Sequence, residues 1–464
     1  MNFMIGTCLL WLTVMLASLC VTPSAAHATE PKLRVLVETD IGGDADDQAS
    51  LVRFLMYSNE WDVEGIIADR SAKTFNIVPV RNHLGLHARN GWELAIEYLK
   101  AYAKVHANLI RHKPGYPTYD HLRRVTVPGT NDSDAGVKLI LKAADIQDPR
   151  PIWYGNWGSN SGEKSNLRRA FDLVKSTRSR PQYEAFVRKF RIVTLDGYGP
   201  TRQGPRHDKQ VVLDVETGYP TMDGGRWYHR FRPLTEHAGG FDVRRDVQRG
   251  HGPLGALYTT PKEGDSWSFI YLIPNGLSDP AQPTWGGWAG RYGPRSDDPR
   301  NKRGPHGRQF YWANQRDTWR GTTNRDNTAR RFAVQLQNDF KARMNWCVAK
   351  RFADANHEPI PHCQGDASRK ILHVAVTPGT VYKLTAAGST DPDGDRLRYR
   401  WFVYAEPGSY RHQVPIENAS SSRALVHMPQ GAAGNTIHVI LCVTDDGSPC
   451  LTRYRRIILR GRVR

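Results

Sequence analysis

The first half of the chain alternates short apolar runs with stretches of helical periodicity. The apolar runs lack regular polar alternation, which is typical of strands buried on both faces of a parallel sheet. These runs are residues 33–37, 60–69, 151–154 and 190–195. Between them, apolar residues recur every three or four positions at residues 92–107, in the second half of 129–144, and at 167–175. This β–α order predicts an α/β domain with a doubly wound, mostly parallel sheet.

The last hundred residues have a different pattern. Strand-like runs are separated by turns of Pro, Gly and Asp, which is the spacing of a β-sandwich. The runs are LHVAVT, VYKLTA, LRYRWFVY, IHVILCVTDD and YRRIIL. Trp401 is the expected core tryptophan, and Asp391, Asp393 and Asp395 form a turn that binds Ca²⁺ or only hydrogen-bonds its own backbone.

Three segments lie between these patterns. Residues 199–249 have little periodicity, and we expect a long insertion or lid there. Residues 269–273 are an apolar run that predicts a buried strand. Residues 326–346 keep an apolar residue every four positions and predict one long helix.

The chain begins with a segment that predicts export. An apolar run at residues 5–21 is followed by small residues and an Ala-His-Ala site at 26–28. No Lys or Arg precedes the run, so a retained membrane anchor is the alternative. We expect a signal peptide over 1–28, an α/β domain over 29–354, a linker over 355–369 and the β-sandwich over 370–464. Without the signal, no stable membrane span is expected, and the protein is secreted, periplasmic or at the cell surface.

Four cysteines remain after the signal: Cys347, Cys363, Cys442 and Cys450. An even number in an exported chain is compatible with disulfides. Proximity along the chain favours Cys347–Cys363 and Cys442–Cys450, although three connectivities are possible. The spacing of the four residues fits no zinc motif.

The chain is basic, with a net charge of +18 from 64 basic and 46 acidic residues among 464. It has no zinc finger, helix-turn-helix pattern or RNA-binding aromatic signature, so we do not expect a nucleic-acid partner. A soluble exported protein with this charge is attracted to acidic polysaccharide or to a cell surface.

Carboxylates gather where the first strand gives way to a helix. Five lie within ten residues, around a Gly-Gly pair: Glu38, Asp40, Asp44, Asp46 and Asp47. Ligands of α/β proteins bind at such carboxyl ends of strands. Carboxylates this close either have raised pKa values or are neutralised by a hard cation, Ca²⁺ or Mg²⁺. The alternative is a solvated turn whose aspartates cap the helix.

This stretch, TDIGGDADDQAS, resembles the N-terminal signature of the nucleoside hydrolases, an Asp-x-Asp-Pro-Gly-x-Asp-Asp-Ala turn. The blocks GHGPLGALY, KEGDSWSFIYLIPNGLSDP and WGGWAGRYG resemble more closely a family of secreted nucleoside-hydrolase-like proteins often labelled cellulose-binding. Members of that family carry a C-terminal β domain, and GSTDPDGDRLRYRWF resembles Ig-like, PKD-type and cadherin-like modules. The resemblance implies a nucleoside-hydrolase-type α/β fold followed by a β-sandwich.

The resemblance also implies roles for the acidic residues. Asp40 matches the aspartate that binds Ca²⁺ and takes a proton from water, while Asp46 and Asp47 match the metal-binding pair. Asp265 is a weaker match to a distal metal aspartate. Ca²⁺ is the implied ion, with Mg²⁺ less favoured. The turn departs from the family pattern, because Ile41 replaces a proline and the turn is longer.

Other candidates come from the downstream blocks. His251 is a candidate acid or substrate donor, or else a structural histidine. Asn160 and Asn166 lie in the polar turn after the strand at 151–154, where they face substrate or metal or only shape the turn. Trp285 and Trp288 form a sugar-stacking wall or belong to the core.

These observations favour a secreted, Ca²⁺-dependent hydrolase of glycosidic or N-glycosidic bonds, with Asp40 as general base. The alternative is a non-catalytic carbohydrate-binding protein on the same scaffold, and a third reading is a surface adhesion protein. The expected partner is a carbohydrate or nucleoside-like small molecule, or a polysaccharide surface. Export and the aromatic content favour carbohydrate.

Overall fold

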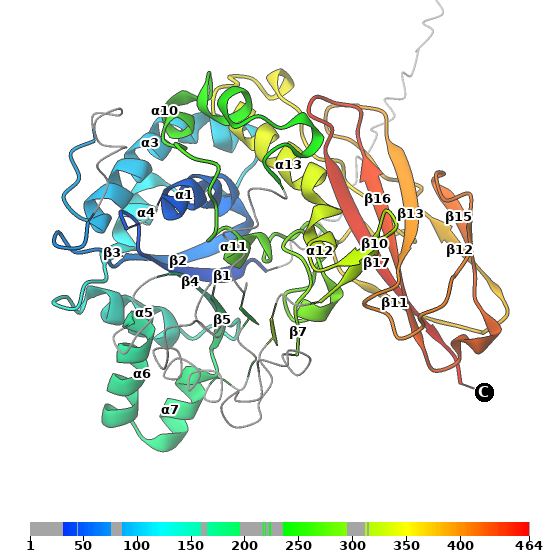
Figure 1. Ribbon diagram of the computed structural model, residues 1–464, viewed down its shortest axis with the longest axis horizontal. Helices are drawn as coiled ribbons and strands as arrows, with labels where there is room; N and C mark the ends of the chain where they lie inside the picture. Colours follow the sequence, from blue (N-terminus) through cyan, green and yellow to red (C-terminus); the bar gives the residue numbers. More distant parts are fainter. Residues whose placement is uncertain are drawn as a thin grey trace, which may run out of the picture. The chain divides into compact units, whose positions relative to one another are not determined.

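The computed structural model describes residues 31–43, 45–75, 86–158, 165–194, 217, 219, 222–223, 235–294, 311–312 and 315–463 (Figure 1). The predicted signal peptide and most of the predicted lid lie outside these ranges. From Lys32 onward, the chain forms one compact unit. Among the described residues, no helix is both long and apolar enough to cross a membrane.

The N-terminal part is built on an eight-stranded sheet with the order β3-β2-β1-β4-β5-β6-β8-β7. All neighbouring strands run parallel except β7 and β8. The strands are β1 (Leu33–Thr39), β2 (Trp61–Ala68), β3 (Thr126–Pro128), β4 (Ile152–Trp157), β5 (Phe190–Thr194), β6 (Met222–Asp223), β7 (Gly293–Pro294) and β8 (Tyr311–Trp312). The chain order reverses between β1 and β4, and the ends of these two strands are where an α/β sheet binds ligands.

Helices cover both faces of this sheet, as Figure 1 shows, so the predicted doubly wound fold is confirmed. On one face, Val35 and Val37 pack with α1 (Asp46–Tyr57), α3 (Gly91–His112), α11 (Trp267–Ile270) and α13 (Ala333–Trp346). On the other face, Leu36 packs with α5 (Ala135–Asp145), α6 (Asn166–Thr177) and α7 (Arg180–Val187). Strand β1 is therefore buried on both sides, which explains why its run lacks a regular alternation of exposed and buried positions.

Shorter elements connect this framework. They are η1 (Ser58–Glu60), α4 (Tyr119–Arg124), η3 (Ala238–Gly240), η4 (Arg244–Gln248), α10 (Gly252–Ala256), η5 (Pro283–Trp285), the hairpin of β9 (Asp317–Trp319) and β10 (Thr322–Asn324), α12 (Asn327–Arg330) and η9 (Phe352–Asp354).

The C-terminal part consists of two facing sheets around a core that contains Trp401, as predicted. One sheet has the order β11-β17-β16-β13 and the other β12-β15-β14. Their strands are β11 (Leu372–Val376), β12 (Val381–Thr385), β13 (Arg398–Tyr404), β14 (Ile416–Glu417), β15 (Arg423–His427), β16 (Thr436–Thr444) and β17 (Thr452–Gly461), with η10 (Gln430–Ala432) before β16. Pairing is antiparallel except between β11 and β17.

The outer face of the larger sheet packs against the α/β part. Arg456 of β17 donates to the carbonyls of Leu277 (2.8 Å) and Trp285 (3.0 Å). Arg453 of the same strand pairs with Asp339 of α13 at 2.6 Å. The segment predicted as a linker is packed as well, because His357 and Cys363 are buried.

Three expectations are wrong in detail. Residues 269–273 lie in α11 and the turn after it, because a short apolar run fits a buried helix as well as a strand. The long helix predicted at 326–346 is interrupted between α12 and α13. The four described cysteines are free; Cys347 Sγ contacts Met56 Sδ at 3.4 Å, and Cys363 packs in the core of the sandwich.

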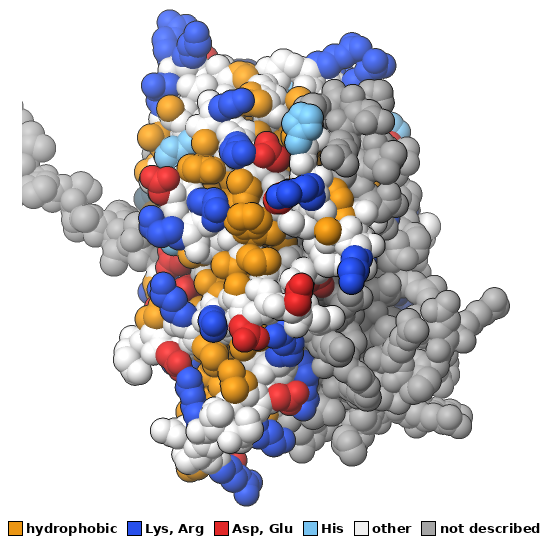
Figure 2. All heavy atoms as spheres, turned by 90° about the vertical axis from the view of Figure 1, so that its left-hand side faces the viewer, with side chains coloured by type: hydrophobic (Ala, Val, Ile, Leu, Met, Phe, Trp, Pro, Cys, Tyr) orange, Lys and Arg blue, Asp and Glu red, His pale blue; other side chains and the backbone are white. Residues whose placement is uncertain are grey.

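The surface carries its charge in dispersed form on the face shown in Figure 2. Lys and Arg side chains alternate there with acidic ones, around a band of hydrophobic side chains. The net charge of +18 is therefore not gathered into a single patch on this face.

Candidate metal centre at the carboxyl ends of the parallel strands

The turn after β1 and the start of α1 bring Asp40, Asp46 and Asp47 close together, and Asp265 joins them from the segment before α11. Strand β1 ends at Thr39, the amide of Gly43 donates to the carbonyl of Asp40 (2.8 Å), and α1 begins at Asp46. Gly42 has a φ of +88°, and a Cβ there would collide with the ring of Phe75. This turn therefore needs glycine at position 42, and it carries Asp46 and Asp47 into the first turn of α1.

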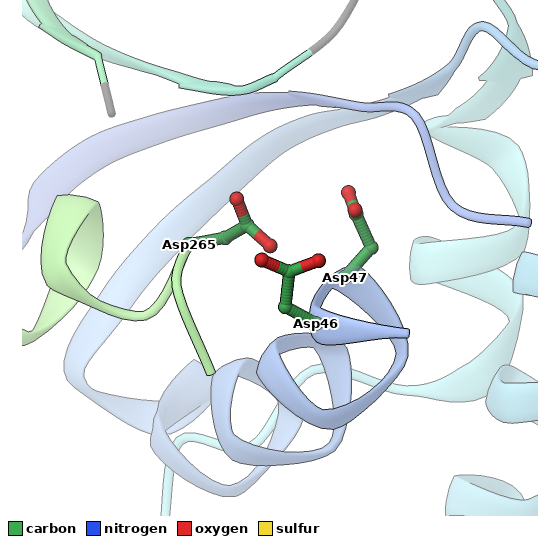
Figure 3. A group of neighbouring side chains, drawn as sticks. All are labelled: Asp46, Asp47 and Asp265. Atoms are coloured by element: carbon green, nitrogen blue, oxygen red, sulfur yellow. The ribbon is translucent and has the colours of Figure 1, made fainter. Parts of the chain in front are cut away.

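Three of the aspartates converge. Carboxylate oxygens of Asp46, Asp47 and Asp265 all lie within 4.8 Å of one another. Figure 3 shows two of these side chains rising from α1 and the third, Asp265, reaching toward them from the segment that leads into α11. Their exposed fractions are 7%, 1% and 4%. The predicted metal residues Asp46, Asp47 and Asp265 are thus brought together from positions far apart in the sequence.

The electrostatics of this group are unbalanced. The pKa of Asp47 is raised well above its usual value, first by burial and then by the charges of Asp265, Asp40 and Asp46. Thr39 Oγ1 donates a hydrogen bond to Asp47. The Nζ atom of Lys262 lies 3.5 Å from Asp46 Oδ1. In the absence of a cation, a proton on Asp47 relieves the repulsion.

The donor set fits a hard divalent cation. Three buried carboxylates offer only oxygen, which Ca²⁺ and Mg²⁺ prefer over nitrogen or sulfur. The raised pKa of Asp47 shows that the local charge is not neutralised by the chain alone. A cation in place of the proton on Asp47 would neutralise the three carboxylates.

Asp40 lies beside this group but has a different partner. Arg70, two residues after β2, forms an ion pair with Asp40 Oδ2, and its Nε donates to the Asp40 carbonyl (3.3 Å). A Cβ at Gly43 would collide with this guanidinium, so the second glycine of the turn makes room for Arg70. Asp40 Oδ1 faces Gly158, where a Cβ would lie 3.7 Å away, and the missing side chain leaves space there.

Glu38 occupies the opposite side of β1 and is fully buried. It accepts hydrogen bonds from the backbone (3.1 Å) and side chain (2.9 Å) of Asn166 and from the hydroxyl of Tyr154. Burial raises its pKa to about 7, although the Asn166 bonds lower it. Asn166, predicted to contact substrate, is itself fully buried. Its side-chain amide donates hydrogen bonds to Glu38 and to the carbonyl of Gly129 (2.8 Å).

The remaining predicted site residues lie elsewhere. His251 begins α10, and its Nε2 lies 3.0 Å from Asn345 Oδ1 of α13. Trp288 is 1% exposed and donates to the Tyr454 hydroxyl (3.2 Å), while the ring of Trp285 packs edge-on against His438. Trp288 belongs to the core, whereas Trp285 is half-buried, and both contact the sandwich. Asn160 lies outside the described residues.

The acidic turn of the sandwich hydrogen-bonds its own backbone. Asp391 Oδ1 accepts from the amides of Asp393 (2.9 Å) and Asp395 (3.2 Å), and the carboxylate of Asp393 binds His357. Oxygens of the three aspartates also lie within 4.8 Å of one another. The structure thus contains the backbone hydrogen bonds that were one of the two interpretations of this turn, the other being Ca²⁺ binding.

Arg70, Thr39 and Lys262 contact the acidic residues without having been assigned a role from the sequence. A signal existed for Arg70, because it follows the end of β2, the strand beside β1. Side chains at the ends of adjacent parallel strands meet at the same edge of a sheet. No comparable signal marks Lys262, which lies on a loop.

Comparisons with known proteins agree with this architecture. The model of the family "Cellulose-binding Sde182, nucleoside hydrolase-like domain" matches residues 34–203 and 228–292. The model "Cellulose-binding protein Sde0182, C-terminal domain" matches residues 381–461. No curated protein matches the chain.

One solved structure resembles nearly the whole chain. It is a nucleoside hydrolase-related hypothetical protein from Saccharophagus degradans, described as associated with carbohydrate metabolism. The two are 29% identical with a TM-score of 0.73, and the match covers 93% of this chain and 100% of that one. The PKD domain from KIAA 1837 protein also matches, at 21% identity over 20% of this chain and 83% of that one. Its TM-score is 0.16, and we draw nothing from it.

The two family models together cover both parts of the chain, and the first alone matches half of it. The chain therefore belongs to the Sde182 family of cellulose-binding proteins, with a nucleoside hydrolase-like domain followed by the C-terminal domain of that family.

Proposed function

We propose that the protein is an exported hydrolase of glycosidic or N-glycosidic bonds that works with a divalent cation, Ca²⁺ rather than Mg²⁺, held by Asp46, Asp47 and Asp265. The observation that carries this proposal is the convergence of three buried carboxylates at the carboxyl ends of the parallel strands. Membership of a cellulose-binding, nucleoside hydrolase-like family supports a carbohydrate substrate. So does the association of the solved relative with carbohydrate metabolism.

When bound, the cation supplies positive charge that polarises water and holds sugar hydroxyls. The side chains of the protein carry out the remaining steps. Asp47 gives up its proton as the cation binds, because its pKa is raised by burial and by neighbouring carboxylates. Asp40 is the general base, with Oδ1 directed at the space beside Gly158. Thr39 fixes the orientation of Asp47 through its hydroxyl.

The contact with Arg70 determines whether Asp40 can act as a general base. Its guanidinium binds Asp40 Oδ2 and the Asp40 carbonyl, so it holds the carboxylate in one orientation. In a hydrolase, this contact leaves Oδ1 of Asp40 to accept a proton from water. The same contact favours a second candidate function, carbohydrate binding without hydrolysis, in which Arg70 permanently neutralises the residue that would act as base.

Substitution of Asp40 separates the two functions. Candidate substrates are nucleosides and plant or microbial glycans, screened with Ca²⁺ present. We expect Asp40→Asn to lower turnover by roughly 10²–10⁴-fold while Ca²⁺ affinity, measured by calorimetry, changes little. Turnover that survives in Asp40→Asn would contradict the role of Asp40. A wild-type protein that binds glycans and Ca²⁺ but cleaves no substrate would establish the second function.

A further inference from the structure

A second candidate site lies between the two parts of the molecule. A cavity of about 660 Å³ is bounded by η3, the β9–β10 hairpin and the start of α13 on one side. The outer face of strands β13, β16 and β17 bounds it on the other, and Figure 1 shows these elements as neighbours. This volume is typical of ligand sites. The cavity shares no residue with the acidic centre.

The lining of this cavity is basic and aromatic. Four arginines and two exposed or half-buried aromatic rings dominate it: Arg320, Arg330, Arg331, Arg400, Trp319 and Phe402. Among the described residues that line it, Glu236 is the single carboxylate. The cavity therefore has an excess of positive charge within an otherwise dispersed surface.

Two of these arginines lack an acidic partner. Arg331 lies 3.4 Å from Asp317 and 3.7 Å from Glu406, so its charge is compensated within the protein. Among the described residues, neither Arg320 nor Arg400 forms an ion pair, and both are exposed. Their charges are available to a ligand.

Both unpaired arginines lie against aromatic rings. The guanidinium carbon of Arg320 is 4.4 Å from the ring centroid of Trp319, and that of Arg400 is 4.8 Å from the centroid of Phe402. Stacking holds each planar guanidinium in place, so less side-chain freedom is lost when it binds a carboxylate with two parallel hydrogen bonds. The adjacent aromatic faces suit the apolar face of a sugar ring.

The backbone of Arg320 adds an independent argument. Arg320 has a φ of +48° at the tip of the β9–β10 hairpin and is followed by Gly321 at +75°. Such turns favour Asn or Gly at this position, because a longer side chain is strained there. Arg320 thus occupies an unfavourable backbone conformation, with its side chain in the wall of the cavity.

We propose that this cavity binds an acidic oligosaccharide, one whose sugar rings carry carboxylates, as in a polyuronate. Carboxylates pair with the two uncompensated guanidinium groups, and sugar faces pack beside Trp319 and Phe402. A neutral glycan offers the same faces but leaves both charges unpaired. The choice of a sugar over another polyanion rests on the carbohydrate association of the family. The site itself requires no chemistry at the acidic centre.

The test uses the full chain in EDTA, so that it is independent of a cation at the acidic centre. Calorimetry compares tetragalacturonate with its methyl ester, with cellotetraose and with a short oligothymidylate. We expect tetragalacturonate to bind roughly tenfold or more tightly than each of the others, with an affinity that falls as salt is raised. Equal binding of the ester or cellotetraose would overturn the acidic assignment, and equal binding of the oligonucleotide would overturn the sugar assignment.

Substitutions locate the binding. Arg320→Asn combined with Arg400→Ala should weaken tetragalacturonate binding roughly tenfold. The matched control is Arg124→Ala combined with Arg423→Ala, which removes two exposed, unpaired arginines outside the cavity and should change affinity less than twofold. Arg320→Asn alone should keep or raise the melting temperature, since Asn tolerates the turn. An equal loss in both double variants would show non-specific attraction to the basic protein and contradict the site.

Discussion

Two groups of buried charge in this protein have opposite characters. The acidic centre contains Asp40, Asp46, Asp47 and Asp265, and the pKa of Asp47 is raised well above its usual value. The second group, here called the ion network, joins η1, α3, α13 and β17. Its members are Glu60, Lys113, Asp339, Arg343, Glu358 and Arg453. In this network, the pKa values of all three carboxylates are lowered.

Burial is similar in the two groups, so burial does not explain the difference. Burial raises the pKa of Glu60, but attraction by Lys113 (2.8 Å) and Arg343 (2.6 Å) outweighs it. Burial also raises the pKa of Asp47, and its carboxylate neighbours raise it further. The sign of the neighbouring charge decides the outcome. A balanced network holds the fold together, whereas the proposed role of the unbalanced acidic centre is to bind a divalent cation.

The ion network should be sensitive to the loss of one cation. Arg343→Met keeps most of the side-chain volume but leaves Glu60 and Asp339 buried with less compensation, so we expect unfolding free energy to fall by about 3–5 kcal/mol. Urea unfolding measures this. The control is Arg351→Met, because the Arg351 side chain is 82% exposed and its pair with Asp354 is screened by solvent, so this variant should unfold like the wild-type protein. A loss below about 1 kcal/mol in Arg343→Met would contradict a structural role for the network.

Glu38 is intermediate between the two groups. Neutral donors surround it, and they offset its burial only in part, so its pKa is about 7 instead of 4.5. Because the folded protein holds this proton more tightly than the unfolded chain, the contribution of Glu38 to stability is fully present below pH 4.5 and is lost as pH rises through about 7. At about 1.4 kcal/mol per pH unit, this amounts to about 3 kcal/mol.

Glu38→Gln should remove this contribution while keeping the acceptor for Asn166. Unfolding free energies of the two proteins, measured from pH 4 to pH 8, should therefore diverge as pH rises, with Glu38→Gln the more stable above pH 7. Parallel curves would show that the neutral donors around Glu38 stabilise its ionised form fully.

Ca²⁺ binding at the acidic centre should stabilise the fold. Ca²⁺ at a hundredfold excess over its dissociation constant should raise the unfolding free energy of the wild-type protein by about 2.7 kcal/mol. Asp265→Asn should abolish the gain, whereas Asp172→Asn, on the exposed side of α6, should preserve it. Equal gains in both variants would place the ion elsewhere.

The sequence predicts the framework of the α/β part closely, and the reason is physical. Strand β1 is buried on both faces and β2 is buried over most of its length, so their runs in the sequence mark their bounds within two residues. The segment at α11 is just as apolar, yet helix and strand cannot be distinguished over so few residues. The periodicity of apolar residues shows which positions are buried, but it does not show which other element of the fold packs against them. For this reason, Trp285 and Trp288 were open to either reading, and both contact the sandwich in the structure.

The site was predictable in part. Asp46 and Asp47 are marked by their strand-to-helix turn, but only the family resemblance connects them with Asp265, more than two hundred residues later. Arg70 was predictable only in part. Its position beside the end of β1 follows from the order of the strands in the sheet. Its ion pair with Asp40 depends on the glycines of the turn, which leave room for the guanidinium, and the sequence pattern does not show this. The cavity between the two parts has no counterpart in the sequence pattern, since it forms only when the sandwich packs against α13.

Calcium calorimetry of the wild-type protein and Asp47→Asn tests the central claim most directly. Titration in two buffers of different ionisation enthalpy, with Asp391→Asn as a control for the acidic turn of the sandwich, measures both affinity and proton release. The unbalanced charge of the acidic centre predicts that wild-type protein and Asp391→Asn release a proton as Ca²⁺ binds, with affinity rising as pH rises. Asp47→Asn should bind weakly and release none. Calcium binding that is unchanged in Asp47→Asn would contradict the metal centre.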